Sequence, residues 1–423
     1  MLFREAGVFC GRSAADVTFK GKLALPIHRW YRLTPSFSPQ LATDIAQYFG
    51  LKGSDLILDP FSGVGTVPVC MKYIGVPSCA VEINPYLFFV SAVKTRTFED
   101  PPAIEKCAAA FLKRVAPDVQ PLRERRAAQE YLLQQEAFVP PIHQPDRWWS
   151  PSNLAQLVAI RKHLLYGAGD YRFPDLIKMA VLSILIPVSN AKHNHVSLTF
   201  ADEPLPPVDV VDVLAKKLRD MVRDLQEAKD RPCAEVQVFQ GNSKFLSRIL
   251  PDNMRISAVI TSPPYPNRFS YARETRPHMF FFDFVPDAKA VGVLETNAIG
   301  GTWGKATSVL SKGVEPANAT VASLLAPYTK RIDGAGKLMA NYVTKYFNDM
   351  YAHAREVSRI SAPGARLAYV IGNSKFYGHP LPSDEMLAAI FRHYGFATEG
   401  IHKMRRRQSK RGLYESVVLM RLR

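Results

Sequence analysis

Short apolar runs, each bounded by Gly, Asn or Pro, alternate with segments of helical length over most of this chain. Runs of this length suit buried strands, and the segments between them are long enough to be crossover helices. The alternation therefore predicts an α/β fold with a doubly wound, mostly parallel sheet. The runs interpreted as parallel strands are DLILD (55–59), SCAVE (78–82), EVQVF (235–239), SAVIT (257–261) and RLAYVIG (366–372).

Two further apolar runs follow near the C-terminal end, EGIHKM (399–404) and ESVVLMRL (415–422). The turn-like stretch SKRG (409–412) lies between them. A pair of strands joined by a short turn predicts an antiparallel hairpin. We place this hairpin on the edge of the sheet, which brings the expected number of strands to seven.

A long strand-poor segment over 100–234 interrupts the alternation. It contains SPSNLAQLVAIRKHLL, which begins with a serine suited to cap a helix and repeats apolar residues at helical spacing. The stretch VVDVLAKKLRDMVRDLQEAK has the same spacing and carries many charges. We predict a helical insertion over 100–234, between one half-domain over 1–99 and another over 235–423. Within the latter, residues 286–336 are rich in Gly, Thr, Ser and Lys and are predicted to be irregular.

The chain of 423 residues is basic, with 54 Lys and Arg against 38 Asp and Glu, and a formal net charge of +16. Such an excess favours a polyanionic partner. A basic surface that is simply solvated remains the alternative, because net charge does not place the charges on one face.

Five cysteines are present, and none of them forms a C-x-x-C pair or a zinc-type spacing with histidine. We therefore expect a protein of the reducing cytoplasm without a metal site. The longest apolar window, MAVLSILIPV (179–188), is too short to span a bilayer and predicts a buried helix. No membrane association is expected.

The stretch LDPFSGVGTV (58–67) is the first candidate for a ligand site. Asp59 ends a predicted strand, Gly63 and Gly65 allow a tight turn, and Thr66 opens a helix whose free amides attract polar ligand groups. The lysine of a phosphate-gripping loop is missing, so the loop suits a ligand with an amino-acid group and an adenosine better than a triphosphate. Glu82 ends the next predicted strand, where a carboxylate can accept hydrogen bonds from both ribose hydroxyls.

The stretch TSPPY (261–265) follows the fourth predicted strand. The exocyclic amine of a nucleobase is a poor nucleophile, because its lone pair is delocalised into the ring. The Ser262 hydroxyl and the Pro263 carbonyl could accept both amine hydrogens and free that lone pair, and proline has no N–H to compete. Tyr265 offers a flat face for an extruded base. The alternative is a loop that simply ends a strand.

These two stretches resemble the S-adenosylmethionine-dependent DNA amino-methyltransferases, specifically the cytosine-N4 branch, whose catalytic motif is commonly S-P-P-Y. The resemblance covers about 30–98 and 235–423. It implies a class I methyltransferase, or Rossmann-like, fold in which 1–99 holds the cofactor-binding half and 235–423 the catalytic half. The cofactor loop precedes the catalytic turn here, opposite to the order in many cytosine-N4 enzymes.

Carried over residue by residue, the resemblance implies two groups of site residues. Glu82 would hold the ribose, and Asn242 would stand near the adenine where the family often has Asp. Ser36 and Phe37 would close over the methionine end of the cofactor. The remaining residues of the cofactor loop are Asp59, Pro60, Phe61, Gly63, Gly65 and Thr66, and the catalytic turn is Ser262, Pro263, Pro264 and Tyr265.

Two basic stretches are candidates for contact with double-stranded DNA. PNRFSYARETRPHMFFFDF (266–284) mixes arginines with aromatics, and its Phe-rich end is interpreted as the buried side of a helix. KMRRRQSKRG (403–412) is predicted to form a hairpin tip that contacts phosphates. The candidate residues are Arg268, Arg273, Arg276, Arg405, Arg406, Arg407 and Lys410.

One short repeat has two interpretations. GNSKF occurs at 241–245 and at 372–376, each time just after a predicted strand. Both copies would lie at the carboxyl edge of the sheet, where doubly wound folds bind ligands. Alternatively, they are two similar strand-ending turns that use Gly and Asn for their backbone freedom.

The sequence thus favours a site-specific DNA methyltransferase that moves a methyl group from S-adenosylmethionine to cytosine N4. Its expected context is a restriction–modification system with a separately acting cognate endonuclease. The alternatives are methylation of adenine N6 in DNA or guanine N2 in RNA, or a catalytically silent nucleic-acid-binding protein of the same fold. Either 100–234 or 286–336 could read the bases.

Overall fold

The structure is a computed structural model. It describes residues 9, 11, 13 and 24–423, except for 34–35, 168–171, 195–196, 201–205, 207, 303, 335 and 408–411.

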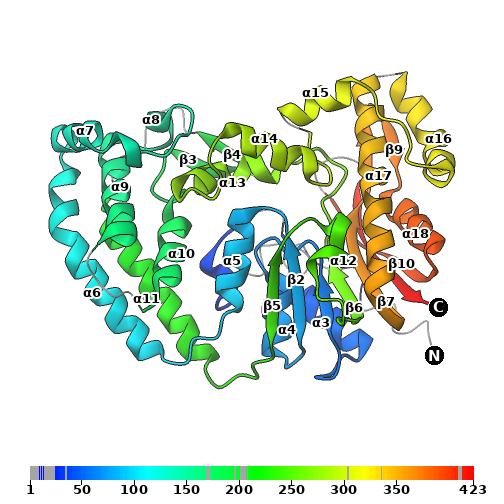
Figure 1. The fold of residues 1–423 in the computed structure, drawn as a ribbon, viewed down its shortest axis with the longest axis horizontal. Helices are drawn as coiled ribbons and strands as arrows, with labels where there is room; N and C mark the ends of the chain where they lie inside the picture. Colours follow the sequence, from blue (N-terminus) through cyan, green and yellow to red (C-terminus); the bar gives the residue numbers. More distant parts are fainter. Residues whose placement is uncertain are drawn as a thin grey trace.

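A seven-stranded sheet forms the centre of the molecule, in the order β10-β11-β7-β6-β1-β2-β5 (Figure 1). Strand β11 runs antiparallel to both of its neighbours, and the other six strands run in one direction. The bounds are β1 Ile57–Asp59, β2 Ser78–Glu82, β5 Val236–Gln240, β6 Ile256–Thr261, β7 Ser361–Gly372, β10 Phe396–Arg406 and β11 Tyr414–Leu422. The predicted fold class, a doubly wound and mostly parallel sheet of seven strands with an antiparallel hairpin, is confirmed.

The hairpin is not simply added to the edge, because β11 lies between β7 and β10. Ser416 pairs with Ile371 on one side and Lys403 on the other. The hydrophobic run of β11 explains this position, since Val417 to Met420 are buried and need neighbours on both sides.

Helices cover both faces of the sheet, and alternate strand residues face opposite layers. In β6, Ala258 and Ile260 pack with α3 (Pro39–Phe49) and α4 (Thr66–Tyr73). Val259, between them, packs on the opposite face with α17 (Lys337–Ile360) and α18 (Ser383–His393). The other elements that flank the sheet are α5 Pro85–Thr95, the 3₁₀ helix η6 Ser243–Phe245 and α12 Leu246–Ile249.

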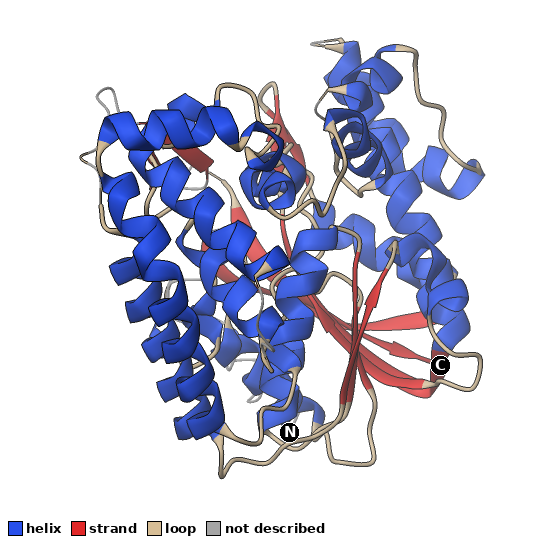
Figure 2. Ribbon diagram, turned by 60° about the vertical axis from the view of Figure 1, so that its left-hand side comes forward, coloured by secondary structure: helices blue, strands red, loops and turns tan. Residues whose placement is uncertain are grey.

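The predicted helical insertion is confirmed as helix-rich and lies to one side of the sheet (Figures 1 and 2). Its helices are α6 Pro101–Val119, α7 Arg125–Gln134, α8 Pro145–Trp148, α9 Pro151–Tyr166, α10 Pro174–Ile184 and α11 Val210–Ala228, with short 3₁₀ turns η4 Gln120–Arg123 and η5 Glu136–Phe138. Strands β3 (Ala191–Asn194) and β4 (Ser197–Phe200) form a small antiparallel pair. As predicted, Ser150 caps α9, where its side chain accepts from the Asn153 amide.

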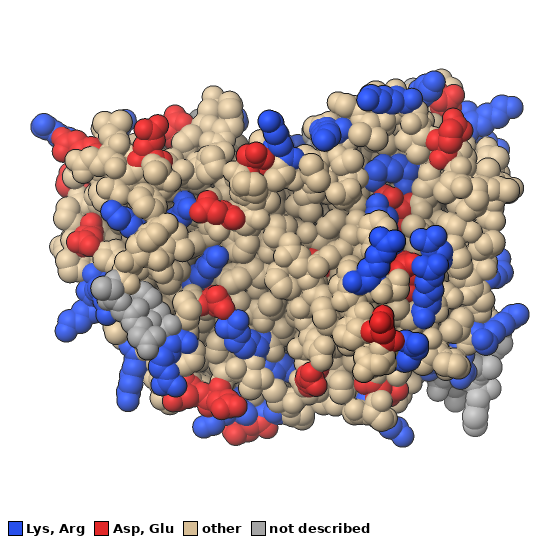
Figure 3. Space-filling view, in the orientation of Figure 1, with Lys and Arg blue, Asp and Glu red and all other residues tan. Residues whose placement is uncertain are grey.

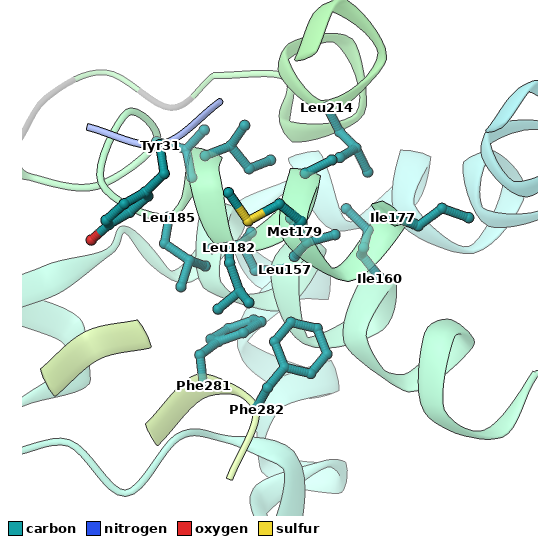
Figure 4. Packing of buried hydrophobic residues seen from close by; sticks show 14 of the residues in the cluster. Tyr31, Leu157, Ile160, Ile177, Met179, Leu182, Leu185, Leu214, Phe281 and Phe282 are labelled. Atoms are coloured by element: carbon teal, nitrogen blue, oxygen red, sulfur yellow. The ribbon is translucent and has the colours of Figure 1, made fainter. Parts of the chain in front are cut away.

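The core of the insertion also includes residues from outside it. Figure 4 shows Leu157, Met179 and Leu214, from α9, α10 and α11, gathered with Phe281 and Tyr31. Phe281 belongs to α13 (Tyr271–Phe281), which follows the TSPPY stretch, and Tyr31 follows the 3₁₀ helix η3 (His28–Trp30). Phe280 to Phe282 are buried, as expected of the Phe-rich end of that segment. The insertion is therefore tied to the segment after the candidate catalytic turn through one shared apolar cluster.

The prediction that 286–336 is irregular is wrong. Three helices form there: α14 Ala288–Asn297, α15 Lys305–Ser311 and α16 Ala319–Asp333. Asp287 and Asn318 accept hydrogen bonds from the Ala290 and Val321 amides and so cap α14 and α16. Helices α14 and α15 are short, and the longer α16 buries only Val321, Leu325 and Ile332, so the apolar periodicity of this segment is weak in the sequence.

Asp224 in α11 fastens the N-terminal segment to the insertion. Its carboxylate is fully buried and accepts hydrogen bonds from the Ile27 amide at 2.8 Å and from Trp30 Nε1 at 2.9 Å. It also pairs with the Arg29 guanidinium, whose pKa is raised by that hydrogen bond. One carboxylate thus satisfies two buried N–H donors and a guanidinium that is partly exposed.

Replacing Asp224 by Ala is expected to destabilise the fold by about 3–5 kcal/mol, because it leaves a cation and two buried N–H groups without an acceptor. Urea unfolding of the purified variant measures this. Asp220→Ala, on the same helix, removes only exposed pairs with Lys216 and Arg223 and should cost under about 1 kcal/mol. Similar midpoints for the two variants would contradict the assignment.

Candidate active site

The two motif-bearing stretches meet at the carboxyl ends of neighbouring strands. Strands β1 and β6 pair in parallel, with Leu58 opposite Val259. The Thr261 hydroxyl donates a hydrogen bond of 2.6 Å to Asp59 Oδ1, which also accepts from the Phe61 amide at 3.2 Å. Burial raises the pKa of Asp59 to about 7, although the bonds from Thr261 and Phe61 oppose this rise. A direct side-chain contact therefore joins the loop after β1 to the turn after β6.

The loop after β1 has the backbone that its glycines predict. Gly63 and Gly65 have φ of 51° and 75°, in the left-handed region that disfavours other residues. A Cβ on Gly65 would lie 2.7 Å from Ser91 Oγ, so the loop packs tightly against α5. A Cβ on Gly63 would meet nothing within 4 Å, so that side of the loop is open. Thr66 begins α4 with Gly65 at the N-cap position.

A buried lysine side chain holds the backbone of this loop. Lys94 in α5 is almost fully buried, and its Nζ donates a 2.9 Å hydrogen bond to the Val64 carbonyl. Burial lowers the pKa of Lys94 to about 7. The sequence analysis did not single out Lys94, because its spacing within an apolar helix gives no signal for contact with a loop thirty residues earlier.

Glu82 reaches the glycine loop from the end of β2. Its Oε2 accepts from the Gly63 amide at 2.8 Å, and its Oε1 accepts from the Asn84 amide at 2.8 Å. Burial raises the pKa of Glu82 to about 7, and these two hydrogen bonds partly offset that shift. The carboxylate therefore holds the backbone of the glycine loop at the end of β2.

The other residues predicted for the cofactor site come from two segments, the loop after β1 and the turn before α3. Pro60 is buried, and the Phe61 ring centroid lies 4.8 Å from that of the buried His353. Phe37 packs in the cluster of α3 and α4, whereas Ser36 Oγ donates to the Leu33 carbonyl at 2.8 Å.

Asn242 follows β5 and has local partners. Its side-chain oxygen accepts from the Lys244 amide, and its Nδ2 donates to the Asn297 carbonyl at 3.1 Å. The second of these bonds connects the end of β5 to the end of α14, and α14 lies with α13 above the sheet in Figure 1. Asn242 thus connects the end of β5 to the end of α14. Its contact with adenine stays a prediction.

The TSPPY turn is held by hydrogen bonds to β7 and α17. Ser262 Oγ donates to the Val370 carbonyl at 3.0 Å, so its single hydrogen is committed, and the Tyr265 hydroxyl is a second hydrogen-bond partner of this side chain. One lone pair of Ser262 Oγ is then left to accept a further hydrogen. The Pro264 carbonyl accepts from the Tyr346 hydroxyl at 2.8 Å. The Arg268 amide donates to the Tyr342 hydroxyl at 3.2 Å.

Tyr342 and Tyr346 lie one turn apart on α17 and were missed by sequence reasoning. Burial raises the pKa values of both phenols, so both stay neutral donors or acceptors at ordinary pH. The neighbouring phenols Tyr342, Tyr265 and Tyr271 further oppose ionisation of Tyr346. The only signal in the sequence was the four-residue spacing of two tyrosines, which does not reveal what they contact.

The predicted DNA-contacting arginines have different surroundings. Arg268 and Arg273 are exposed, and Arg276 is partly buried, which lowers its pKa. Arg405 is paired with Glu415 across the hairpin, with its Nε 2.7 Å from Oε2, and both side chains are largely buried. Its assignment to phosphate contact is therefore corrected, since its charge is already neutralised by the opposite strand.

The three remaining basic candidates also divide. Arg406 is exposed, whereas the Arg407 guanidinium carbon lies 5.8 Å from the centroid of the Tyr265 ring. Lys410 lies outside the described residues. On the face seen in Figure 3, Lys and Arg are interspersed with Asp and Glu around a central area with few charges, so the net positive charge is not gathered into one patch there.

Within the described part of the chain, no group of three or more His, Cys, Asp or Glu side chains could hold a metal ion. None of the helices described is both long enough and apolar enough to cross a membrane.

The sheet order, in which the antiparallel strand β11 lies between β7 and β10, is that of the class I methyltransferase or Rossmann-like fold expected from the sequence. No family model matches the chain. It is similar to the type II methyltransferase M.BsoBI of Geobacillus stearothermophilus, with 23% identity over 438 residues that cover 93% of this chain and 83% of that protein.

Comparison with solved structures gives distant similarities. TrmN from Thermus thermophilus has a TM-score of 0.31 and 9% identity over 92% of this chain, which spans 49% of the TrmN chain. The rRNA methyltransferase aviRa from Streptomyces viridochromogenes has a TM-score of 0.31 and 12% identity, over 97% of this chain and 96% of the other.

Proposed function

We propose that this protein is an S-adenosylmethionine-dependent methyltransferase that modifies the N4 amino group of cytosine in double-stranded DNA. The observation that carries the proposal is the Thr261–Asp59 hydrogen bond, because it brings the cofactor loop and the catalytic turn together at one sheet edge. Two loops in contact allow a methyl group to pass directly between ligands bound on each of them. The similarity to a type II methyltransferase supports DNA as the substrate and a restriction–modification context with a separate endonuclease.

The residues present fit the cofactor. Gly63 leaves space above the loop, the Glu82 carboxylate stands beside that space, and the start of α4 directs free amides toward it. When bound, S-adenosylmethionine supplies an electrophilic methyl group on a sulfonium. Ser36, Phe37, Asp59, Pro60, Phe61 and Thr66 complete the proposed binding site, with Asn242 near the adenine.

The catalytic turn acts on the nucleophile. Ser262 Oγ and the Pro263 carbonyl would accept the two hydrogens of the cytosine amine, which favours tetrahedral geometry at its nitrogen and frees the nitrogen lone pair to act as the nucleophile. The bound donor would supply the methyl group and keep the carbon–sulfur bonding pair as a neutral thioether, and the proton lost by the nitrogen would pass to water. Tyr265 holds the extruded base, while Pro264 is fixed by Tyr346. Arg268, Arg273, Arg276 and Arg406 are proposed to contact the DNA backbone.

Cofactor affinity is expected to rise with pH through about 7. Ribose hydroxyls donate to Glu82, so binding favours the ionised carboxylate and lowers its pKa from the raised value of about 7 in the free protein. Below that pH, binding must first remove a proton. Calorimetric titration with a non-reactive sulfonium analogue between pH 5.5 and 8.5 measures the slope. Glu82→Gln should bind more weakly and lose the part of this slope that Glu82 contributes, and identical slopes would refute the ribose contact.

The test of the proposed function is mass spectrometry of nucleosides from DNA and RNA of cells that express the protein, with Ser262→Ala as the control. The expected product is N4-methylcytosine in DNA with the wild-type chain alone. N6-methyladenine in DNA or N2-methylguanine in RNA would move the target to those amines. Cofactor binding without any methylated nucleoside would favour a catalytically silent nucleic-acid-binding protein.

A further inference from the structure

The second GNSKF copy lies beside the catalytic turn, and the first does not. Gly372 ends β7, where a Cβ would lie 3.0 Å from Cδ2 and Cε2 of Tyr265 and 2.9 Å from Arg407 Nη1. A Cβ on Gly241, in the first copy, would instead meet Ile249. The two copies therefore have different neighbours, and only Gly372 allows a catalytic ring and a guanidinium to approach the backbone.

Arg407 is fixed by the residue that follows Gly372. Its Nη1 donates to the Asn373 carbonyl at 3.2 Å, and its amide donates to the Leu413 carbonyl at 2.8 Å. Asn373 in turn accepts from the Tyr414 amide at 2.8 Å and donates through Nδ2 to the Gly412 carbonyl at 3.0 Å. The end of β7 thereby fastens both sides of the β10–β11 hairpin next to Tyr265.

We infer that Arg407 is a positioning residue for Tyr265 rather than a phosphate contact. Its guanidinium is held between the Asn373 carbonyl and the Tyr265 ring, and Gly372 provides the room for this arrangement. A ring fixed in this way loses little rotamer entropy when an extruded base binds against it. The inference deepens the proposed function and depends on it for the role of Tyr265.

Arginine suits this position better than lysine does. A planar guanidinium can bond to a carbonyl in its plane and at the same time lie over an aromatic ring, whereas a lysine ammonium is a compact and strongly hydrated charge. The neighbouring basic residues differ, since Arg405 is paired with Glu415 and Arg406 is exposed. Three consecutive arginines therefore have three separate roles.

Kinetics of the purified full-length protein on unmethylated plasmid DNA test the inference. Arg407→Ala is expected to lower kcat about tenfold, because the Tyr265 ring is no longer held in place, while the salt dependence of DNA binding keeps its slope. Arg407→Lys should recover little of the loss. Arg421→Ala is the matched control, because Arg421 is an exposed arginine of the same hairpin at the end of β11 that lies away from Arg407. Unchanged kcat with a salt slope reduced by about one unit would make Arg407 a phosphate contact and overturn the inference.

Gly372→Ala is a second, independent variant. Its methyl group must displace the Tyr265 ring or the Arg407 guanidinium, so the same loss of kcat is expected. Gly53→Ala is its control, because a Cβ there makes only an ordinary contact of 3.4 Å with the Gly75 carbonyl.

Hydrogen exchange of the segment 262–270 separates this inference from the proposed function, because it needs no methyl transfer. The Asn267 and Arg268 amides are bonded to the Tyr265 carbonyl and the Tyr342 hydroxyl, and both should exchange faster in Arg407→Ala and Gly372→Ala. Unchanged exchange in both variants would refute the positioning role. If both variants exchange faster but the wild-type protein methylates no nucleic acid, the positioning role stands and the proposed function is refuted.

Discussion

Ser262→Ala is expected to lower kcat for methyl transfer by about 100-fold or more, the usual effect of removing one hydrogen-bonding group aimed at a transition state. The Ser262 hydrogen is already donated to the Val370 carbonyl, so the side chain can only accept from an incoming amine. That interaction strengthens as the nitrogen becomes cationic, so its loss should appear in kcat rather than in ground-state binding.

Single-turnover methylation with radiolabelled S-adenosylmethionine measures the chemical step for this variant, and calorimetry with a sulfonium analogue measures cofactor affinity. Affinity should stay close to the wild-type value. Ser257→Ala is the control, because it removes a serine hydroxyl at the other end of β6, where that hydroxyl accepts from the Leu56 amide. Equal losses of turnover and cofactor affinity would contradict the role of Ser262 as an acceptor for the amine.

Asp59→Ala is expected to weaken cofactor binding at least tenfold and to destabilise the fold. It strands the buried Thr261 hydroxyl and the Phe61 amide, each at a cost of about 1–3 kcal/mol. Asp59→Asn should be milder, because the amide keeps an acceptor oxygen and resembles the carboxyl group that is half protonated near pH 7.

Calorimetry and thermal unfolding of the two variants measure these effects, with the exposed Asp252→Ala as the control. Thr261→Val should reproduce part of the loss, because it removes the same hydrogen bond from the other side. Wild-type cofactor affinity in both Asp59→Ala and Thr261→Val would show that the contact between the two loops is not needed to form the site.

The main features of the sheet could be predicted because they depend on local patterns. SCAVE and SAVIT are short apolar runs that end in polar residues, and β2 and β6 coincide with them within one residue. Strand order places the carboxyl ends of β1, β2 and β6 together, so Asp59, Glu82 and Ser262 could be grouped before any contact was known.

The side chains that support the site could not be predicted, because their partners lie far away in the sequence. Tyr346 bonds to the Pro264 carbonyl 82 residues earlier, and Lys94 bonds to the Val64 carbonyl 30 residues earlier. A tyrosine or a lysine in a sequence gives no indication of which distant carbonyl it will bond to. Arg405 was misassigned for the same reason, since only the hairpin register places Glu415 opposite it.

The place of β11 has a consequence for how the molecule becomes active. Residues 414–422 form an interior strand, so β7 has an unpaired flank until they have been synthesised and inserted. The carbonyl that anchors Ser262 belongs to β7, and the Asn373 side chain is satisfied by Gly412 and Tyr414. The end of β7 that carries Val370 and Asn373 therefore gains its second row of partners only when β11 pairs with it, so the support of the TSPPY turn is completed by the last strand of the sheet to be synthesised.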